Sequence, residues 1–260
     1  MAPLNGFSLA ARLRAGETIY SGWCSLASPI IAEIAAREGF SAVGLDGQHG
    51  LWDSESIRVA IAAIRQGGAA PIVRIALEDF GSASRALDWG AEGIIAPMIN
   101  NVADAKRFAD ACKFPPIGER SWGPHRALML GGISDVNSYL RDANDNIVTL
   151  AMIETQEAMD NLDAIAAVPG IDVLFVGPSD LSITLTEGAE LDPTSKIVEA
   201  ANDKVLAACK KAGKYAGLYC ATAERAVAVS KRGFRYCPIG NDLGFIRAAY
   251  AAAAKVTSGG

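Results

Sequence analysis

The sequence has no excess of positive charge, no long apolar segment and no paired cysteines. With 24 Lys and Arg against 29 Asp and Glu, the net charge of −5 gives no basic surface of the kind that binds nucleic acid. No stretch approaches the roughly 20 apolar residues that a membrane-spanning helix needs. Residues 1–7 lack the positive start and apolar core of a signal peptide. We therefore expect a soluble, cytoplasmic protein that binds neither nucleic acid nor membrane.

Histidine and cysteine are also scarce. The chain has two histidines, His49 and His125, and an imidazole can titrate near neutral pH. The five cysteines are odd in number and form no Cys-x-x-Cys pair, which argues against a zinc or redox motif. We expect all five to be reduced thiols in the core.

What the sequence does have is a regular alternation of strand-like and helical segments. Half of its residues are apolar, and 260 residues is close to the roughly 250 of a typical α/β barrel. No change in composition marks a linker. The eight strand-like runs cover residues 19–25, 42–45, 71–76, 93–98, 147–153, 173–178, 215–220 and 235–240. This pattern predicts a single (β/α)₈ TIM barrel over residues 1–260, with an open doubly wound sheet as the alternative.

Two segments depart from the short connections elsewhere in the chain. Residues 114–126 carry Gly and Pro, and a second excursion follows Asp180 and continues to Asp192. Long loops in a compact domain are usually functional or mobile. The first loop contains His125, which can equally contact a substrate or have no role.

Two carboxylates follow neighbouring apolar runs. Glu154 comes directly after the fifth run and Asp180 shortly after the sixth. In a barrel the C-terminal ends of the strands face the active site. Two oxygen ligands there, with no His or Cys nearby in sequence, favour a hard cation such as Mg²⁺ or Mn²⁺ over zinc. The alternative is that each carboxylate caps the following helix or pairs with a nearby cation.

His49 and Arg74 are the other candidates for chemistry. His49 lies just beyond the second run, after Asp46, and is a candidate general base, although loop histidines are often only solvated. Arg74 lies in the apolar third run, where an unpaired guanidinium is very costly. It is either a clamp for an anion or enolate, or one half of a structural ion pair. Asp88 lies in the next helix, and sequence alone gives it no role.

Four elements of the sequence, taken together, resemble a known family. They are Asp46-Gly-Gln-His49-Gly, Arg74 in its strand, Ile153-Glu154-Thr, and Phe175-Val-Gly-Pro-Ser-Asp180-Leu-Ser. Their types, order and spacing resemble the metal-dependent (class II) pyruvate aldolases of the HpcH/HpaI aldolase and citrate lyase superfamily. The resemblance extends from about Phe7 to the last helix.

The resemblance implies a cofactor and a way of binding substrate. A divalent metal ion, Mg²⁺, Mn²⁺ or Co²⁺, would be held by Glu154 and Asp180 and chelated by a 2-oxo acid such as pyruvate. Backbone amides around Ser179 and Asp180 would bind the carboxylate of that acid.

The resemblance also implies catalytic roles. The histidine that matches His49 is the acid/base, and the arginine that matches Arg74 stabilises the enolate. An aspartate that matches Asp88 raises the basicity of the histidine, and Asp46 would lie in the same water network. Because no lysine lies in a predicted strand, the aldolases that use a covalent lysine are disfavoured.

The chain departs from the family pattern at two positions. Gln48 stands where Glu is common, and Met152 stands where a Gln contacts the oxo acid. The second departure leaves the choice between pyruvate and hydroxypyruvate open. The loop with Trp122 and His125 resembles the family's loop over the substrate tail, where it would influence which aldehyde is accepted.

We predict an aldolase that reversibly cleaves 4-hydroxy-2-oxo acids into pyruvate, or hydroxypyruvate, and an aldehyde. The alternatives are a CoA-thioester lyase of the citrate lyase or malyl-CoA lyase type and a barrel that binds an oxo acid without turning it over. From the family we expect a homo-oligomer, a hexamer built as a trimer of dimers with the last helix exchanged. The apolar residues 243–250 are equally compatible with closing the barrel of a monomer.

Overall fold

Eight parallel strands pair in chain order, and β1 also pairs with β8, so the sheet closes into a barrel. The structure is a computed structural model that describes residues 6–257. The strands are β1 (Ile19–Cys24), β2 (Ala42–Asp46), β3 (Ala70–Arg74), β4 (Gly93–Ala96), β5 (Val148–Ile153), β6 (Val173–Val176), β7 (Tyr215–Leu218) and β8 (Tyr236–Ile239). The predicted barrel is confirmed, and the open sheet is excluded.

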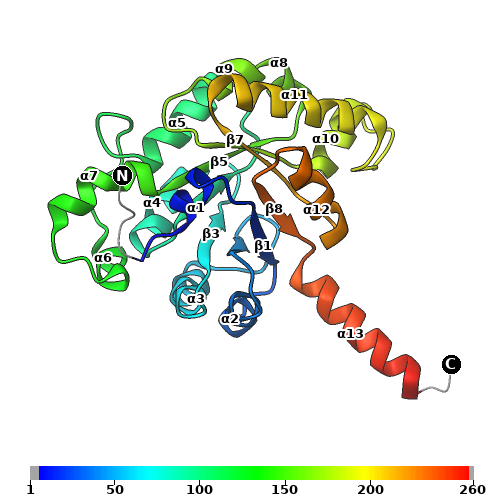
Figure 1. The fold of residues 1–260 in the computed structure, drawn as a ribbon, viewed down its shortest axis with the longest axis horizontal. Coiled ribbons are helices and arrows are strands. Elements are labelled where there is room, and N and C mark those ends of the chain that lie inside the picture. The colour runs from blue at the N-terminus through cyan, green and yellow to red at the C-terminus, as the bar shows by residue number, and fades with distance from the viewer. Residues whose placement is uncertain (1–5, 258–260) are drawn as a thin grey trace.

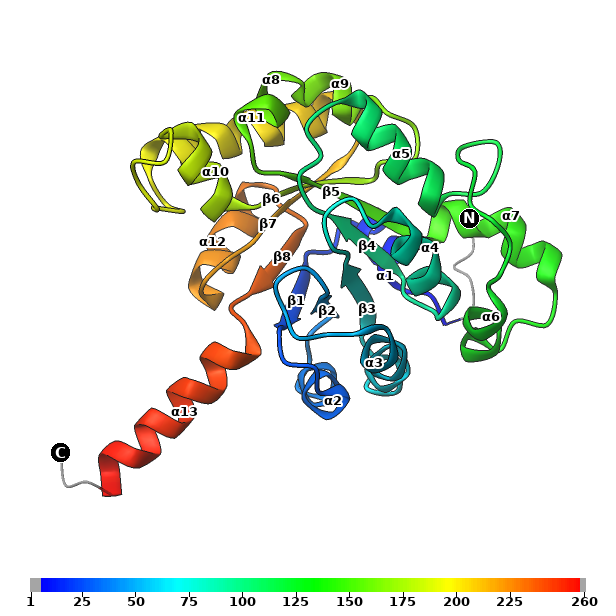
Figure 2. The same ribbon diagram turned by 180° about the vertical axis from the view of Figure 1, so that it is seen from behind.

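Most of the helices surround the barrel on its outer side (Figures 1 and 2). The helices of the described chain are α1 (Leu9–Arg14), α2 (Pro29–Arg37), α3 (Ser54–Gln66), α4 (Phe80–Asp88), α5 (Val102–Cys112), α6 (His125–Gly131), α7 (Val136–Asn146), α8 (Gln156–Asp160), α9 (Leu162–Ala166), α10 (Pro178–Leu185), α11 (Lys196–Ala212), α12 (Ala223–Arg232) and α13 (Asp242–Thr257). Side chains of Ser28, Asn101 and Thr222 accept hydrogen bonds from the first turns of α2, α5 and α12. Within residues 6–257, no helix is both long and apolar enough to span a bilayer.

Helix α1 lies against the N-terminal ends of the strands. Leu9 and Leu13 pack in one buried cluster with residues from the barrel interior, including Ile72 and Leu150. The carboxylate of Glu92, the residue directly before β4, accepts hydrogen bonds from the Ser8 and Leu9 amides at 2.7 and 2.9 Å. This end of the barrel interior is therefore filled, and active sites of such barrels lie at the C-terminal ends of the strands.

The two segments expected as long loops are partly helical. Helices α6 and α7 lie between α5 and β5, and α10 begins two residues after β6. Neither α6 nor α10 has a side-chain N-cap, so the usual sequence signal of a helix start is missing. The helical segment between β5 and β6 is divided at Asn161 into α8 and α9.

Helix α13 projects away from the barrel (Figures 1 and 2). Its first residue, Asp242, is buried and accepts hydrogen bonds from the Ser25 and Leu26 amides at 2.8 and 3.0 Å. Farther along, apolar side chains are exposed, and Tyr250 is 73% exposed. An apolar cavity of about 350 Å³ lies between α2 and the start of α13. The helix is thus fixed at its root and leaves part of the barrel wall uncovered.

A buried lysine connects the segments that lead into β5 and β6. Lys113 is 1% exposed, and its Nζ donates to the carbonyls of Asn144 and Ile147 at 2.8 and 2.6 Å. The same Nζ lies 2.8 Å from Oδ2 of Asp172, which also accepts from the Thr149 amide. Every donor of the ammonium group therefore has an acceptor, which offsets the cost of burying its charge.

We expect Lys113→Met to lower the free energy of unfolding by about 2–3 kcal/mol, because it removes the donor that two carbonyls share and the positive charge beside the Asp172 carboxylate. Lys211→Met is the matched control, since Lys211 forms an exposed ion pair with Asp163 and should contribute under about 1 kcal/mol. Urea unfolding at pH 7 measures both. Equal losses in the two variants would contradict this account of Lys113.

Candidate active site

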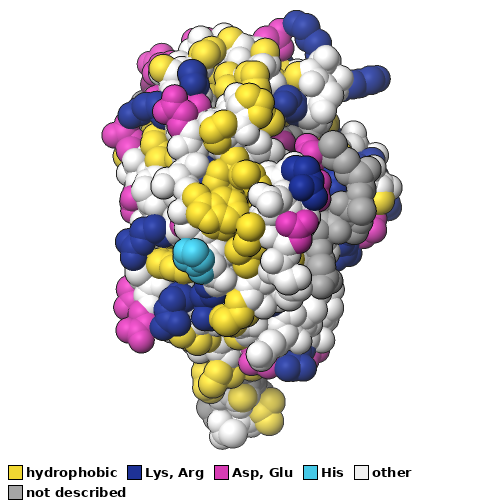
Figure 3. All heavy atoms as spheres, turned by 90° about the vertical axis from the view of Figure 1, so that its left-hand side faces the viewer, with side chains coloured by type: hydrophobic (Ala, Val, Ile, Leu, Met, Phe, Trp, Pro, Cys, Tyr) yellow, Lys and Arg dark blue, Asp and Glu magenta, His cyan; other side chains and the backbone are white. Residues whose placement is uncertain are grey.

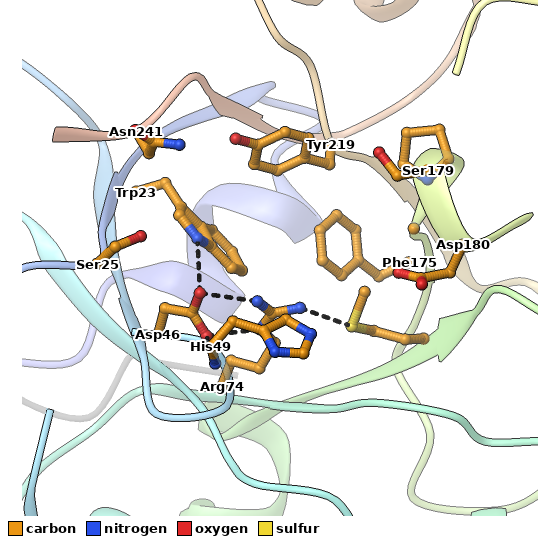
Figure 4. A pocket seen from close by; sticks show the side chains of 13 residues that line it. Trp23, Ser25, Asp46, His49, Arg74, Phe175, Ser179, Asp180, Tyr219 and Asn241 are labelled. Atoms are coloured by element: carbon orange, nitrogen blue, oxygen red, sulfur yellow. Dashed lines mark hydrogen bonds and ion pairs between the residues drawn. The ribbon is translucent and has the colours of Figure 1, made fainter. Parts of the chain in front are cut away.

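A cavity of about 290 Å³ opens at the C-terminal ends of the strands (Figure 4). Its lining residues come from or follow β1, β2, β3, β5, β6, β7 and β8. They are Trp23, Ser25, Asp46, His49, Arg74, Met152, Phe175, Gly177, Pro178, Ser179, Asp180, Tyr219 and Asn241. The barrel thus brings together residues that are up to about 220 positions apart in sequence. The cavity lies at the end of the barrel where substrates bind in enzymes with this fold.

A buried ion pair forms the floor of this cavity. Asp46 and Arg74 are the last residues of neighbouring strands and lie directly opposite each other in the sheet. Nε and Nη2 of Arg74 donate to Oδ1 and Oδ2 of Asp46 at 2.9 and 2.7 Å. The arginine is 8% exposed and the aspartate 2%. Arg74 is therefore one half of a structural ion pair, which was one of the two roles expected for it from the sequence. The pair has the bidentate geometry that makes such interactions strong.

Further contacts fix the charge state and orientation of the pair. Burial alone would raise the pKa of Asp46, but the hydrogen bonds and charge of Arg74 and the amides of His49 and Gln48 bring it below its ordinary value. Cζ of Arg74 lies 5.0 Å from the centre of a Trp23 ring. Nη1 of Arg74 points toward Sδ of Met152 at 4.0 Å (Figure 4). Arg74 is thus held as a fixed positive charge at the cavity wall.

His49 is placed at the cavity by a tight turn after β2. The Gly47 amide donates to the carbonyl of Arg74 at 2.9 Å, and the Gly50 amide to that of Asp46 at 3.0 Å. A Cβ on Gly47 would lie 2.7 Å from the carbonyl oxygen of Arg74, so only glycine allows this close approach. The imidazole is exposed and lines the cavity beside the ion pair. It can therefore exchange a proton with a bound molecule.

Glu154 and Asp180 lie on the β5 and β6 side. Glu154 directly follows β5 and is 3% exposed, whereas Asp180 is exposed in the first turn of α10 and not at a strand end. Oε1 of Glu154 accepts from the Met98 amide at 2.7 Å, and Oε2 has no hydrogen bond to another described residue. Burial raises the pKa of Glu154 to about 7, and the charge of Asp180 adds to this rise. The charge of Arg74 acts in the opposite direction but does not cancel the effect of burial, and Arg74 makes its hydrogen bonds to Asp46.

This arrangement fits a divalent cation. Among residues 6–257 no group of three or more His, Cys, Asp or Glu side chains is placed to hold a metal, so the candidate ligands are these two carboxylates. Magnesium-like ions commonly use one or two protein carboxylates and complete their shell with water and substrate oxygens. A cation between Glu154 and Asp180 would also offset the burial of the Glu154 charge and the repulsion by Asp180, which together raise the pKa of Glu154.

Ser179 lines the cavity next to Asp180, and its contribution to the site is its backbone amide. The amides of Ser179 and Asp180 lie in the first turn of α10, where a helix leaves its N–H groups without internal acceptors. Such amides bind anions readily, and the helix dipole adds to the attraction. They are therefore placed to receive the carboxylate of a small acid in the cavity.

Four predicted site residues are not among those that line this cavity. Glu154 borders the lining, because its Oε2 lies next to Gly177, whereas the other three lie elsewhere. Asp88 pairs with Arg120 at 2.7 Å, Trp122 packs on Phe114 with ring centroids 5.7 Å apart, and His125 begins α6. Asp88 ends α4, just before β4, and Trp122 and His125 lie between α5 and β5, so all three lie toward the N-terminal ends of the strands. Figure 3 shows the surface on the left-hand side of Figure 1, where α6 and α7 lie and apolar side chains gather. Within one chain, the cavity and this surface are on opposite sides of the barrel.

Sequence reasoning missed several residues that line the cavity. Ser25, Tyr219 and Asn241 each follow the end of a strand, and Trp23 and Phe175 lie within β1 and β6. The position rule for barrels would have found the first three. Trp23 and Phe175 carry no such signal, because an aromatic residue in a strand is usually part of the core.

We expect Glu154→Gln to stabilise the metal-free protein at pH 8. The pKa of Glu154 is raised in the folded state, so its stabilising contribution is present below the unfolded-state value near 4.5 and is lost as the pH rises through about 7. The ionised carboxylate then costs up to about 3 kcal/mol, which glutamine avoids while still accepting from the Met98 amide.

Thermal unfolding in EDTA at pH 8 and pH 5 measures this effect. The melting temperature of the variant should exceed that of the native protein at pH 8, and the difference should shrink at pH 5. A variant less stable than the native protein at pH 8 would show that Glu154 is not strained by its burial.

Comparisons with known proteins agree with the geometry. A family model described as HpcH/HpaI aldolase/citrate lyase matches residues 20–249. A hydroxypyruvate/pyruvate aldolase of Rhizorhabdus wittichii is 37% identical over 234 residues, which are 90% of this chain and 92% of the relative. A 4-hydroxy-2-oxovalerate aldolase of Novosphingobium aromaticivorans is 37% identical, with 81% and 80% of the two chains covered.

A solved structure is similar over almost the whole chain. It is an HpcH/HpaI aldolase/citrate lyase family protein from Burkholderia cenocepacia, with a TM-score of 0.85 and 32% identity. The alignment covers 96% of this chain and 99% of that one. The resemblance seen in the sequence motifs therefore holds for the fold and for the full length of the domain. This chain belongs to the HpcH/HpaI aldolase/citrate lyase family.

Proposed function

We propose that the protein is a metal-dependent aldolase that reversibly cleaves 4-hydroxy-2-oxo acids into pyruvate, or hydroxypyruvate, and an aldehyde. The observation that carries this proposal is the buried carboxylate of Glu154 beside Asp180, at a cavity that also presents Arg74 and His49. The aldolase names of relatives at 37% identity support the same reaction class.

Cleavage of a C–C bond next to a hydroxyl needs a base for that hydroxyl and a place for the electrons of the broken bond. We assign the base to His49, which takes the proton of the 4-hydroxyl group as the bond between C3 and C4 breaks and the aldehyde leaves. The fixed charge of Arg74 stabilises the negative charge that develops on the oxo acid. When bound by Glu154 and Asp180, a divalent ion (Mg²⁺, Mn²⁺ or Co²⁺) supplies further positive charge to the oxo acid.

The remaining cavity residues bind and orient the oxo acid. The amides of Ser179 and Asp180 hold its carboxylate, and Asp46 keeps the guanidinium of Arg74 in place. Met152 presents a thioether where the family has an amide, so a 3-hydroxyl group on the oxo acid gains no strong partner there. We therefore propose that both pyruvate and hydroxypyruvate are accepted.

The size and charge of the cavity favour this reaction over a CoA-thioester lyase. Among its described lining residues Arg74 is the only Lys or Arg, and it is already paired with Asp46. Nothing in the lining is thus free to neutralise the phosphates of CoA. A volume of about 290 Å³ suits a small oxo acid and a short aldehyde.

His49→Ala should lower kcat/KM for cleavage of a 4-hydroxy-2-oxo acid by about 10²–10⁴-fold, because a positioned general base contributes that much. Its affinity for Mn²⁺ should not change, since His49 is not a proposed ligand. The native protein should lose activity in EDTA and regain it with Mn²⁺. Coupled assays of pyruvate release measure the rates, with malyl-CoA as the competing substrate; turnover of malyl-CoA alone, or full activity without metal, would contradict the proposal.

We further propose a cytoplasmic homo-oligomer, a hexamer arranged as a trimer of dimers. The projecting helix α13 and the apolar cavity between α2 and α13 are suited to an exchange of this helix between two copies. If Asp88, Trp122 and His125 have the roles that the family resemblance implies, they must act in the cavity of another copy. Their own cavity lies at the opposite end of the barrel.

Complementation between two variants tests this shared site. His49→Ala and Asp88→Asn should each be weakly active alone, and their co-expressed mixed oligomers should recover up to about a quarter of native activity, because some sites then combine both native residues. Sedimentation velocity establishes that the oligomers form. Recovery no greater than the sum of the two variants would show that Asp88 does not serve a neighbouring cavity.

A further inference from the structure

Met98 has an unusual backbone conformation next to the candidate metal site. Its φ of 53° lies in the left-handed region, which residues with a Cβ rarely adopt. Among the described residues, the other non-glycine positions with positive φ are Glu78 and Glu187, and both are exposed. Met98 differs from them because it is half-buried, in the connection between β4 and α5.

Because of this left-handed conformation, two successive amides point toward residues at the C-terminal end of β5. The Met98 amide donates to Oε1 of Glu154 at 2.7 Å, and the Ile99 amide donates to the carbonyl of Met152 at 3.2 Å. The next residue, Asn100, accepts from the Thr155 hydroxyl at 2.6 Å. These contacts hold the segment against the loop that carries Glu154. A strained conformation persists where surrounding contacts fix it in this way, and such positions cluster at functional sites.

Gly177 borders the other oxygen of the same carboxylate. A Cβ on Gly177 would overlap Oε2 of Glu154 and would lie 2.9 Å from Cε of Met152. The φ of Gly177 is −92°, which any residue can adopt, so glycine is needed here for space and not for backbone freedom. One side of the Glu154 carboxylate therefore accepts a hydrogen bond from the Met98 amide, and the other side lies against a glycine that has no Cβ to displace it.

We propose that the backbone of Met98, and not its side chain, orients Glu154 for metal binding, and that Gly177 provides the space for this orientation. Met98 and Gly177 are thus positioning residues. One carboxylate oxygen is held by the amide of Met98, which leaves Oε2 free to bind the ion. The inference rests on the proposed function in one respect, that Glu154 is a metal ligand.

Three substitutions of Met98 separate the backbone from the side chain. Met98→Gly removes the side chain and Met98→Asn replaces it with a short amide, but both residues accept a left-handed conformation, so the affinity for Mn²⁺ should stay within about twofold of native. Met98→Ile keeps an apolar side chain of similar size but is β-branched and resists this conformation, so the affinity should fall about tenfold or more. Isothermal titration calorimetry with Mn²⁺ alone, without substrate, measures all three.

Gly177→Ala tests the other side of the carboxylate. Its Cβ should displace Glu154 and lower Mn²⁺ affinity by about tenfold or more, since the loss of one hydrogen bond or ligand contact to a charged group is of this size. Gly81→Ala in α4 is the matched control, because a Cβ there meets no atom closer than 3.7 Å and the affinity should stay native. Melting temperatures in EDTA establish that each variant is folded.

The possible results are distinct. Loss of affinity in Met98→Gly equal to that in Met98→Ile would assign the role to the side chain and overturn the inference. Native affinity in Met98→Ile and in folded Gly177→Ala would also overturn it, while leaving the proposed function intact. A native protein that does not bind Mn²⁺ would overturn the proposed function and this inference together.

Discussion

The structure depends on how ionised groups are compensated at the mouth of a barrel whose walls are apolar. Removing a charge from water is costly, so a buried charge persists only with partners. Asp46 and Arg74 meet this condition through a bidentate pair, and burial of the pair is offset by further donors. Glu154 meets it only in part, because one amide is its only hydrogen-bond donor among the described residues, the charge of Arg74 acts on it without a hydrogen bond, and Asp180 repels it. This imbalance makes the site a place for a cation.

The two ends of the barrel are used differently. At the N-terminal ends, Glu92 and Lys113 are buried with hydrogen-bond partners, and α1 fills the opening, so charge there stabilises the fold. At the C-terminal ends, charge is left partly uncompensated and available for a ligand. The α6 and α7 surface belongs to the first end, which is why residues expected over the substrate lie far from their own cavity. A shared site in an oligomer would reconcile these two observations.

Much of the fold could be predicted because buried parallel strands are continuous apolar runs, and all eight appear in the sequence near their observed positions. Helices α6 and α10 could not, because neither begins with a capping side chain. The positions of Glu154, Arg74 and His49 near strand ends were also predictable from spacing. The position of Asp180 in a helix and the left-handed conformation of Met98 could not be predicted from the sequence, and only the three-dimensional structure shows them.

By itself the sequence determined the barrel, its strand order and the chemical types available at its mouth, because hydrophobic periodicity and residue order are local properties of the chain. Only the tertiary structure decided which charges meet. The pairing of Arg74 with Asp46, the isolation of Glu154 and the distance of Asp88 from the cavity depend on strand register and on which end of the barrel a loop joins. Local sequence does not encode these relations, since they arise from contacts between segments far apart in the chain.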